Sequence, residues 1–319
     1  MDVGDKLYGT VLVSEPVLVE LLNCNAVQRL RGVNQNGLPA EFSKFPSFSR
    51  FEHSVGVMLL LKQLGASVEE QIAGLCHDVS HPAFSHVIDW VFGLGTHGLE
   101  DLQDDNHSWF VSKTEIPSIL QKHGFSVSIV NNFKQFSLLE KSIPDVCADR
   151  VDYALREMML WANSSAVNHC LGSLCVVDNC IVFSSKSAAL DFSRAFLKMQ
   201  VENWGSADSM LKYLCFAKVL QLALQRGYIS MQDLYTVDDV VLQKLAVCND
   251  EAVLKELSAM RNGVALSNGS IHLVKKFRYV DPLFYDNGVL VRLSCAVPSF
   301  AGEIEVARKK NREGISALA

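Results

Sequence analysis

Several features that assign a protein to a class from composition alone are missing from this sequence. The chain has no CxxC pair, no internal repeat and no low-complexity linker. Its main early apolar run, Val55–Leu61, is interrupted by a glycine and is too short to cross a bilayer. The opening residues MDVGDKL lack the pattern of a secretory signal. We therefore expect a soluble, intracellular protein of the cytoplasm, with reduced thiols and no membrane partner.

An excess of positive charge is also missing. The 319 residues include 29 Lys and Arg against 35 Asp and Glu, a formal charge of −6, so no global attraction draws the chain to nucleic acid. We expect no specific nucleic-acid binding, and any anion site must be local. With 49% hydrophobic residues the chain can bury one large core or two modest ones. A homodimer or higher homo-oligomer is the default assembly, because closed homo-oligomers are common.

Helical periodicity dominates from residue 17 to about residue 160. Ser67 and Glu70 are spaced as a capping box for a helix that runs toward Cys76. His123 and Gly124 are expected to close a helix that begins near residue 116. These signals predict a mainly α fold with its functional residues in the first half of the chain.

Strand patterns come later and are short. Residues 171–184 contain two β-rich runs around Asp178-Asn179, which predicts a tight hairpin. Helical periodicity returns over 187–261, and the tail has Asn268-Gly269 and Asn287-Gly288 turns before a short final helix near 304–312. We therefore expect a helical body over 1–262, with the hairpin at 171–184, and a small α+β C-terminal extension over 263–319, packed on the same body.

Two imidazoles and two carboxylates are the strongest chemical signal. His53 lies three residues after Arg50 at the start of an apolar helix, and His77-Asp78 ends the next helix. Asp149 lies on a later amphipathic helix. Together, His53, His77, Asp78 and Asp149 offer nitrogen and oxygen ligands that neutralise one divalent ion and leave positions open for water and a phosphate oxygen. These ligand types suit Mn, Fe, Ni, Co, Zn or Mg, and the sequence does not choose among them.

A second group of metal-ligand residue types is weaker. His169, Cys170, Cys175 and Cys180 lie close in sequence, but they have neither the pair spacing nor the second half of a zinc site. Buried thiols beside a hairpin are the favoured interpretation.

The ordered metal set resembles that of the HD-domain phosphohydrolase superfamily, whose signature is His, then His-Asp, then a distant Asp. The resemblance is closer still to the branch of SAM-and-HD-domain deoxynucleoside triphosphate triphosphohydrolases. It covers about residues 7–157 and rests on five strings: QRLR at 28–31, SRFEHS at 49–54, GLCHD at 74–78, FSH at 84–86 and DRVDY at 149–153. An HD-domain helical core is the fold that this resemblance implies.

The resemblance also implies roles for residues around the metal. His107 is the expected acid for the leaving oxygen, with Asp104 or the neighbouring Asp105 holding its imidazolium form. The other implied contacts are with the substrate: His81 and His86 line the phosphate path, Arg50 binds a phosphate oxygen, Arg150 and Tyr153 face the pocket, and Gln35 contacts the sugar.

Departures from that branch leave the substrate open. Asn36 stands where the triphosphohydrolases have an apolar residue against the sugar, and Arg194 is only a substitute for the cation that grips a triphosphate. Triphosphohydrolysis of deoxynucleotides is the first expectation. A phosphomonoesterase acting on nucleoside monophosphates or other small esters, and a nucleotide-binding regulatory protein with little turnover, are the alternatives.

Overall fold

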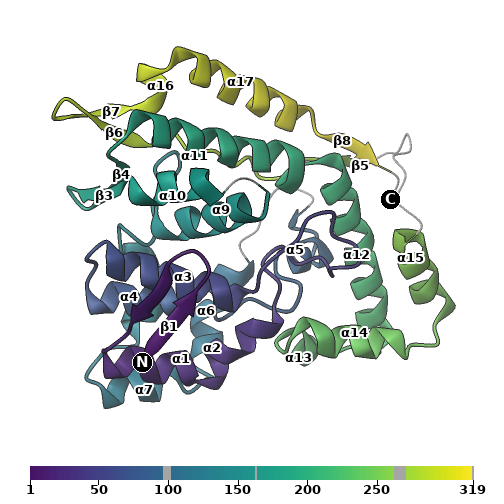
Figure 1. Ribbon diagram of the computed structural model, residues 1–319. Coiled ribbons are helices and arrows are strands. Elements are labelled where there is room, and N and C mark those ends of the chain that lie inside the picture. The colour runs from purple at the N-terminus through teal and green to yellow at the C-terminus, as the bar shows by residue number, and fades with distance from the viewer. Residues whose placement is uncertain (96–101, 162–163, 262–270, 318–319) are drawn as a thin grey trace.

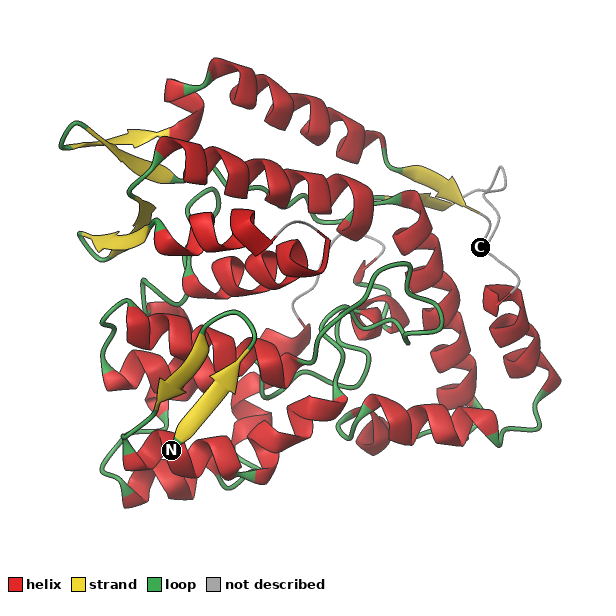
Figure 2. Cartoon of the chain, viewed as in Figure 1, coloured by secondary structure: helices red, strands yellow, loops and turns green. Residues whose placement is uncertain are grey.

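The computed structural model describes residues 1–95, 102–161, 164–261 and 271–317. The protein is mainly helical, as the sequence predicts, and its strands belong to small sheets at the periphery (Figure 2). Within these ranges no helix is long and apolar enough to span a membrane.

The first half of the chain is built around α3 (Arg50–Gln63). This helix is almost wholly buried and packs against α4 (Val68–Cys76) and α9 (Ala148–Trp161), which carry the other functional side chains. The remaining elements of this half are β1 (Asp2–Asp5), β2 (Gly9–Leu12), α1 (Pro16–Asn23), α2 (Asn25–Arg29), η1 (Leu30–Gly32), α5 (Val87–Val91), α6 (Leu102–Val111), α7 (Ile116–Lys122), α8 (Ser128–Asn131) and η3 (Phe133–Gln135). The β1–β2 hairpin was not foreseen from the sequence.

Side-chain caps fix where α3 and α4 begin. Ser49 and Glu52 form a complete capping box at α3, which places His53 one turn into the helix. Ser67 caps α4 as predicted, but the predicted second half of its box is wrong: the Glu70 carboxylate accepts hydrogen bonds from the backbone N–H groups of residues 138 and 139. Glu70 therefore ties α4 to the segment that leads into α9.

The second half packs above and beside this body (Figure 1). Its helices are α10 (Ser164–Gly172), α11 (Lys186–Met199), the π-helix η4 (Gln200–Trp204), α12 (Ala207–Gln225), α13 (Met231–Leu234), α14 (Asp238–Ala246) and α15 (Glu251–Arg261). Helix α12 packs against α5 and α15, and this group encloses a second hydrophobic core beside the main one.

A four-stranded sheet joins the predicted hairpin to the C-terminal extension. Its order is β3 (Leu174–Val177), β4 (Cys180–Phe183), β6 (Leu283–Asp286), β7 (Val289–Arg292), with β4 and β6 parallel. Asn287-Gly288 forms the predicted turn, and the predicted turn at residues 268–269 lies outside the described residues.

Helix α17 is longer than predicted. It runs over Pro298–Glu313 because the proline at its first turn starts it earlier and Phe300 buries that turn. The last elements are α16 (Leu293–Ala296) before it, and β5 (Ile271–Leu273), which pairs antiparallel with β8 (Ile315–Ala317).

The cysteines near residue 170 form no metal cluster in the part of the chain that the structure describes. The Cys170 thiol is buried and donates to the Ala188 carbonyl oxygen, and Cys175 is half-buried and donates to Val182. His169 is exposed and bonds the Ser187 hydroxyl. These side chains therefore take part in separate contacts within the described part of the chain.

Candidate active site

Helices α3, α4 and α9 bring the predicted metal ligands together. His53 Nε2 lies 3.0 Å from Asp149 Oδ1, and His77 Nε2 lies 3.6 Å from the same oxygen. Asp78 closes the group, with its Oδ1 3.5 Å from His77 Nε2 and its Oδ2 3.8 Å from His53 Nε2. All four side chains therefore converge, although His77 and Asp78 are adjacent at a helix end.

The orientation of both imidazoles fits a metal ion. His77 Nδ1 donates to the carbonyl oxygen of Gly74 at 2.8 Å, and His53 Nδ1 lies 2.8 Å from a carboxylate oxygen of Asp152. When each ring carries its proton on Nδ1 alone, its Nε2 is available as a lone-pair donor to a metal ion. The buried Nε2 of His77 has no hydrogen-bond partner, as expected of an atom that binds a metal ion.

Both carboxylates are ionised. Burial raises the pKa of Asp78, but the neighbouring Arg50, His77 and His81 lower it by more. The resulting pKa lies well below the ordinary value of an aspartate. Burial also raises the pKa of Asp149, but the neighbouring imidazoles of His53 and His77 lower it by more, so this pKa is likewise lowered. Two negative charges therefore face the two ring nitrogens.

Arg50 and the two further histidines flank this cluster. The Arg50 guanidinium is buried and donates to Asp78 and to the Ser85 hydroxyl. His81 Nε2 lies 3.3 Å from Asp78, and His86 Nδ1 lies 3.2 Å from Asp89. Arg50, His81 and His86 all line one cavity, and their contact with phosphate stays a prediction.

The cavity over the cluster has a volume of about 220 Å³ and is strongly charged. Five cationic side chains line it together with four carboxylates. The charged lining residues are Arg50, Asp78, Asp104, Lys134, Glu140, Asp149, Arg150, Lys276 and Arg278. Arg150 donates to Glu140 at 3.0 Å, which holds its guanidinium at the wall.

A second pocket of about 80 Å³ adjoins the first and is largely aromatic. Gln35, His86, Tyr153 and Arg278 line both, so they mark the junction. The side pocket is completed by Asn36, Glu157, Trp204, Tyr213 and Lys275.

Two acceptors in this pocket are buried. The Glu157 carboxylate accepts hydrogen bonds from Trp204 Nε1 at 2.8 Å and Asn203 Nδ2 at 3.3 Å, and burial raises its pKa to about 7. The side-chain oxygen of Gln35 is buried without a partner. Both groups can accept a hydrogen bond from a donor group of a ligand.

His107 and Asp104 do not form the predicted pair. His107 is buried on α6 and shares its Nδ1 with the Ser80 hydroxyl at 2.8 Å, while Asp104 pairs with Lys134. Burial lowers the pKa of His107 to about 4, which favours the neutral ring at pH 7. Asp104 therefore does not pair with His107, which lies behind the cavity lining, and the role of His107 as the acid stays a prediction.

The residues missed from the sequence come from the C-terminal extension and from α9. Lys275, Lys276, Phe277 and Arg278 form a short cationic and aromatic run that was visible in the sequence but was not connected to the site. The expected substitute cation, Arg194, is half-exposed and pairs with Glu303 on α17, outside the cavity. Glu157 was overlooked, although it follows Tyr153 by one helical turn.

Comparisons with known proteins agree with this geometry. The model of the HD domain matches residues 50–154, which contain all four proposed ligands. The metal-dependent phosphohydrolase cns2 of Cordyceps militaris is 30% identical over 316 residues, 94% of this chain and 90% of that protein. The uncharacterized protein YdhJ of Bacillus subtilis is 34% identical, over 99% of this chain and 98% of its own length.

The chain belongs to the HD-domain phosphohydrolase family. It is a metal-dependent phosphohydrolase and therefore acts on a phosphorylated substrate. The fold agrees: a hypothetical protein from Aquifex aeolicus matches with a TM-score of 0.69 at 17% identity, covering 98% of this chain and 99% of that one.

Similarity to the triphosphohydrolase branch is more restricted. The deoxynucleoside triphosphate triphosphohydrolase of Xenopus laevis is 36% identical over 106 residues, 28% of this HD-domain chain and 16% of that enzyme. The two full-length relatives carry no substrate in their names.

Proposed function

We propose that this phosphohydrolase cleaves the ester bond between a phosphate and a nucleoside. The observation that carries the proposal is the junction of two cavities, one holding the metal-ligand cluster and the other walled by Tyr153, Trp204 and Tyr213. A phosphoryl group over the cluster places its ester oxygen at the junction and its organic part in the aromatic pocket. A nucleoside has a flat base, which packs against aromatic side chains, and sugar hydroxyls, which donate hydrogen bonds. This pocket has aromatic walls for the base and buried acceptors for the hydroxyls.

Gln35 and Glu157 supply the polar contacts to the sugar. The unpartnered side-chain oxygen of Gln35 accepts a hydrogen bond from a sugar hydroxyl near the junction. The Glu157 carboxylate accepts a hydrogen bond from a second hydroxyl, deeper in the pocket. Tyr153 bounds the sugar at the junction, because its side chain lines both cavities.

His53, His77, Asp78 and Asp149 are the proposed ligands of a divalent metal, whose chemistry when bound is to polarise a phosphoryl oxygen and to lower the pKa of water. Around it, Arg50 and Arg150 stabilise negative charge on the phosphoryl oxygens in the transition state. Their partners Asp78 and Glu140 fix both guanidinium groups before substrate arrives.

His86 is the residue that we assign as proton donor. It lines both cavities, and Asp89 orients its ring through Nδ1. In the proposed step a water oxygen bonds to phosphorus, the bond from phosphorus to the nucleoside oxygen breaks, and the His86 proton moves to that oxygen. The proton that the attacking water releases passes to solvent, and His86 takes up a proton from solvent before the next turnover. His107 lies behind the cavity and supports this site rather than touching the ester.

Deoxynucleoside triphosphates are the first proposed substrate, because four of the five strings that resemble the triphosphohydrolases contribute residues to the walls of the two cavities. Nucleoside monophosphates are the second, because Arg194 lies outside the cavity where a grip on the triphosphate was expected. The test is chromatographic product analysis after incubating the manganese-loaded protein with deoxynucleoside triphosphates, ribonucleoside triphosphates and monophosphates. Tripolyphosphate with free nucleoside supports the first substrate, and orthophosphate from monophosphates alone supports the second. No nucleoside from any of them contradicts the proposal.

A further inference from the structure

The turn that carries His86 is seated in the second hydrophobic core. The apolar side chains of residues 83–91 pack there with side chains of α12, α14 and α15. The Phe84 ring is fully buried and meets the Phe216 ring of α12 edge to face, with the two centroids 4.8 Å apart. Helices from the second half of the chain therefore set the place of a turn that carries a proposed active-site residue.

Two consecutive residues of this turn adopt the left-handed backbone conformation. Phe84 has a φ of 62° and Ser85 a φ of 45°, values that residues with a side chain rarely adopt. A turn of this kind persists only where the surrounding structure holds it. His86 is the next residue, so the direction of its ring depends on these two backbone conformations.

One buried carboxylate holds the turn. Asp238 is the first residue of α14, at the lower end of the second half in Figure 1, and it is 9% exposed. Its Oδ1 accepts a hydrogen bond from the Phe84 N–H at 2.8 Å, and its Oδ2 accepts one from the Asn34 N–H at 2.9 Å. The carboxylate thus joins the segments that lead to Gln35 and to His86, two side chains that line both cavities.

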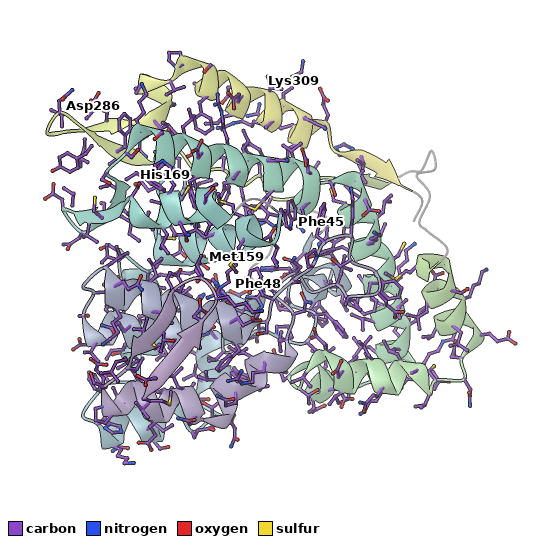
Figure 3. All side chains as sticks on the ribbon, viewed as in Figure 1. Phe45, Phe48, Met159, His169, Asp286 and Lys309 are labelled. Atoms are coloured by element: carbon purple, nitrogen blue, oxygen red, sulfur yellow. The ribbon has the colours of Figure 1, made fainter. Side chains whose placement is uncertain are left out.

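The segment that leads to Gln35 is itself fixed to the start of α3. The Gln35 N–H donates to the carbonyl oxygen of Phe48 at 3.0 Å, near the centre of the molecule in Figure 3. The Arg50 N–H, at the first residue of α3, donates to the carbonyl oxygen of Val33 at 2.9 Å. Asp238 therefore ties the turn to the helix that carries the first proposed metal ligand.

Other contacts hold the same turn without this carboxylate. The carbonyl oxygen of Leu234, the last residue of α13, accepts a hydrogen bond from the Ala83 N–H at 2.7 Å. The Arg29 guanidinium donates to the carbonyl oxygen of His81 at 2.7 Å. Because these bonds do not involve Asp238, we expect the turn to remain folded when Asp238 is changed.

We propose that Asp238 is a positioning residue of the reaction, which sets the place of His86, the proton donor, relative to Gln35, the sugar contact. Asp238 lines neither cavity, so it acts through the two backbone N–H groups that it binds. The inference rests on the proposed function, because His86 and Gln35 have these roles only when a phosphate ester of a nucleoside occupies the two cavities.

Asp238→Asn breaks one of the two hydrogen bonds, because an amide NH2 group cannot accept from a backbone N–H. In the folded, manganese-loaded variant we expect kcat/KM for nucleotides to fall about 10- to 100-fold, with an unchanged manganese content. Turnover of p-nitrophenyl phosphate, which has no sugar and needs no proton at its leaving group, should fall less than about twofold. The matched control is Asp239→Asn, which changes the exposed neighbour and should affect neither substrate.

NMR spectra of protein labelled with ¹⁵N-histidine report the surroundings of the His86 ring without turnover. Magnesium takes the place of manganese in these samples, because manganese is paramagnetic and broadens nearby signals. We expect the His86 signal, assigned with the variant His86→Gln, to move in Asp238→Asn and to stay in place in Asp239→Asn. Thermal unfolding curves confirm that each variant is folded.

Two results would overturn the inference and leave the proposed function in place. One is a His86 signal that does not move in Asp238→Asn, and the other is an equal loss of turnover with nucleotides and with p-nitrophenyl phosphate, which indicates a structural role only. If the His86 signal moves but the parent protein releases no nucleoside from any nucleotide, the positioning of His86 by Asp238 stands and the proposed reaction fails.

Discussion

The carboxylate of Asp152 lies 2.8 Å from Nδ1 of His53, on the side of the ring opposite the metal cluster. Asp152 is itself held by the Tyr8 hydroxyl at 2.9 Å and by Arg156 Nε at 2.8 Å, and Arg156 also pairs with Asp5 of the N-terminal hairpin. Asp152 and Arg156 are almost fully buried. This network extends to Asp5 in β1, and it fixes the tautomer and the ring orientation of His53, a proposed metal ligand.

Asp152→Asn is therefore expected to weaken metal binding. The amide keeps the shape but loses the charge that strengthens the basicity of His53, and such substitutions cost about 10- to 100-fold in affinity. Titration of metal-free protein with manganese measures the change. Tyr8→Phe, which removes one hydrogen bond to Asp152, should cause a smaller loss. Equal manganese affinity in a folded Asp152→Asn protein would show that the network is structural only.

Gly56 is required by the same network. A Cβ at this position would lie 2.0 Å from Arg156 Nη2 and 2.1 Å from Asp152 Oδ1. Gly56→Ala should lower the free energy of unfolding by about 1–3 kcal/mol, because neither buried partner can move away. Gly302→Ala is the matched control: nothing lies within 4 Å of its Cβ, and helix α17 should gain about 0.5–1 kcal/mol. Urea denaturation compares them, and opposite signs are the expected result.

Glu157 should make the stability of the protein depend on pH. Burial raises its pKa from 4.5 to about 7, so the folded state binds the proton more tightly than the unfolded state. The contribution to stability is full below about pH 4.5 and falls as the pH rises to 7, by up to about 3 kcal/mol. Glu157→Gln removes this slope. Urea denaturation at pH 5 and pH 8 should show a larger drop for the parent than for the variant, and parallel drops would contradict the assignment.

His86→Ala should slow nucleotide hydrolysis by about 10²- to 10⁴-fold without loss of metal, because it removes the proposed proton donor. The defect should be much smaller with p-nitrophenyl phosphate, whose leaving group needs no proton. His107→Ala is the comparison: it should also spare the metal, with a smaller loss of turnover. If His107→Ala slowed turnover more than His86→Ala, His107 rather than His86 would be the proton donor.

The helical core and the metal cluster were accessible from the sequence because both depend on local patterns. Capping residues at Ser49 and Ser67 fix the starts of two helices, and fixed helix starts set the directions of His53 and His77. The order His, His-Asp, Asp along the chain resembles the HD-domain signature, and this resemblance predicted the four side chains that converge.

The position of His107 could not be predicted in the same way. Its neighbours in sequence, Asp104 and Asp105, suggest a charged surface, but the fold buries the ring against Phe133 and turns Asp104 toward Lys134. The position of residues 275–278 is harder still to predict, because it depends on the pairing of β5 with the distant β8 and on a hydrogen bond from the Asn311 amide of α17. Long-range contacts of this kind leave no periodic signal in one sequence.

The central claim is that His53, His77, Asp78 and Asp149 hold the metal on which hydrolysis depends. The most direct test measures bound manganese and nucleotide hydrolysis side by side, in chelator-stripped protein, in reloaded protein, and in folded Asp78→Asn and Asp149→Asn variants. We predict that activity follows the bound manganese, returns on reloading, and disappears together with the metal in both variants. Hydrolysis that persists in the stripped protein, or in a variant that binds no metal, would contradict the account.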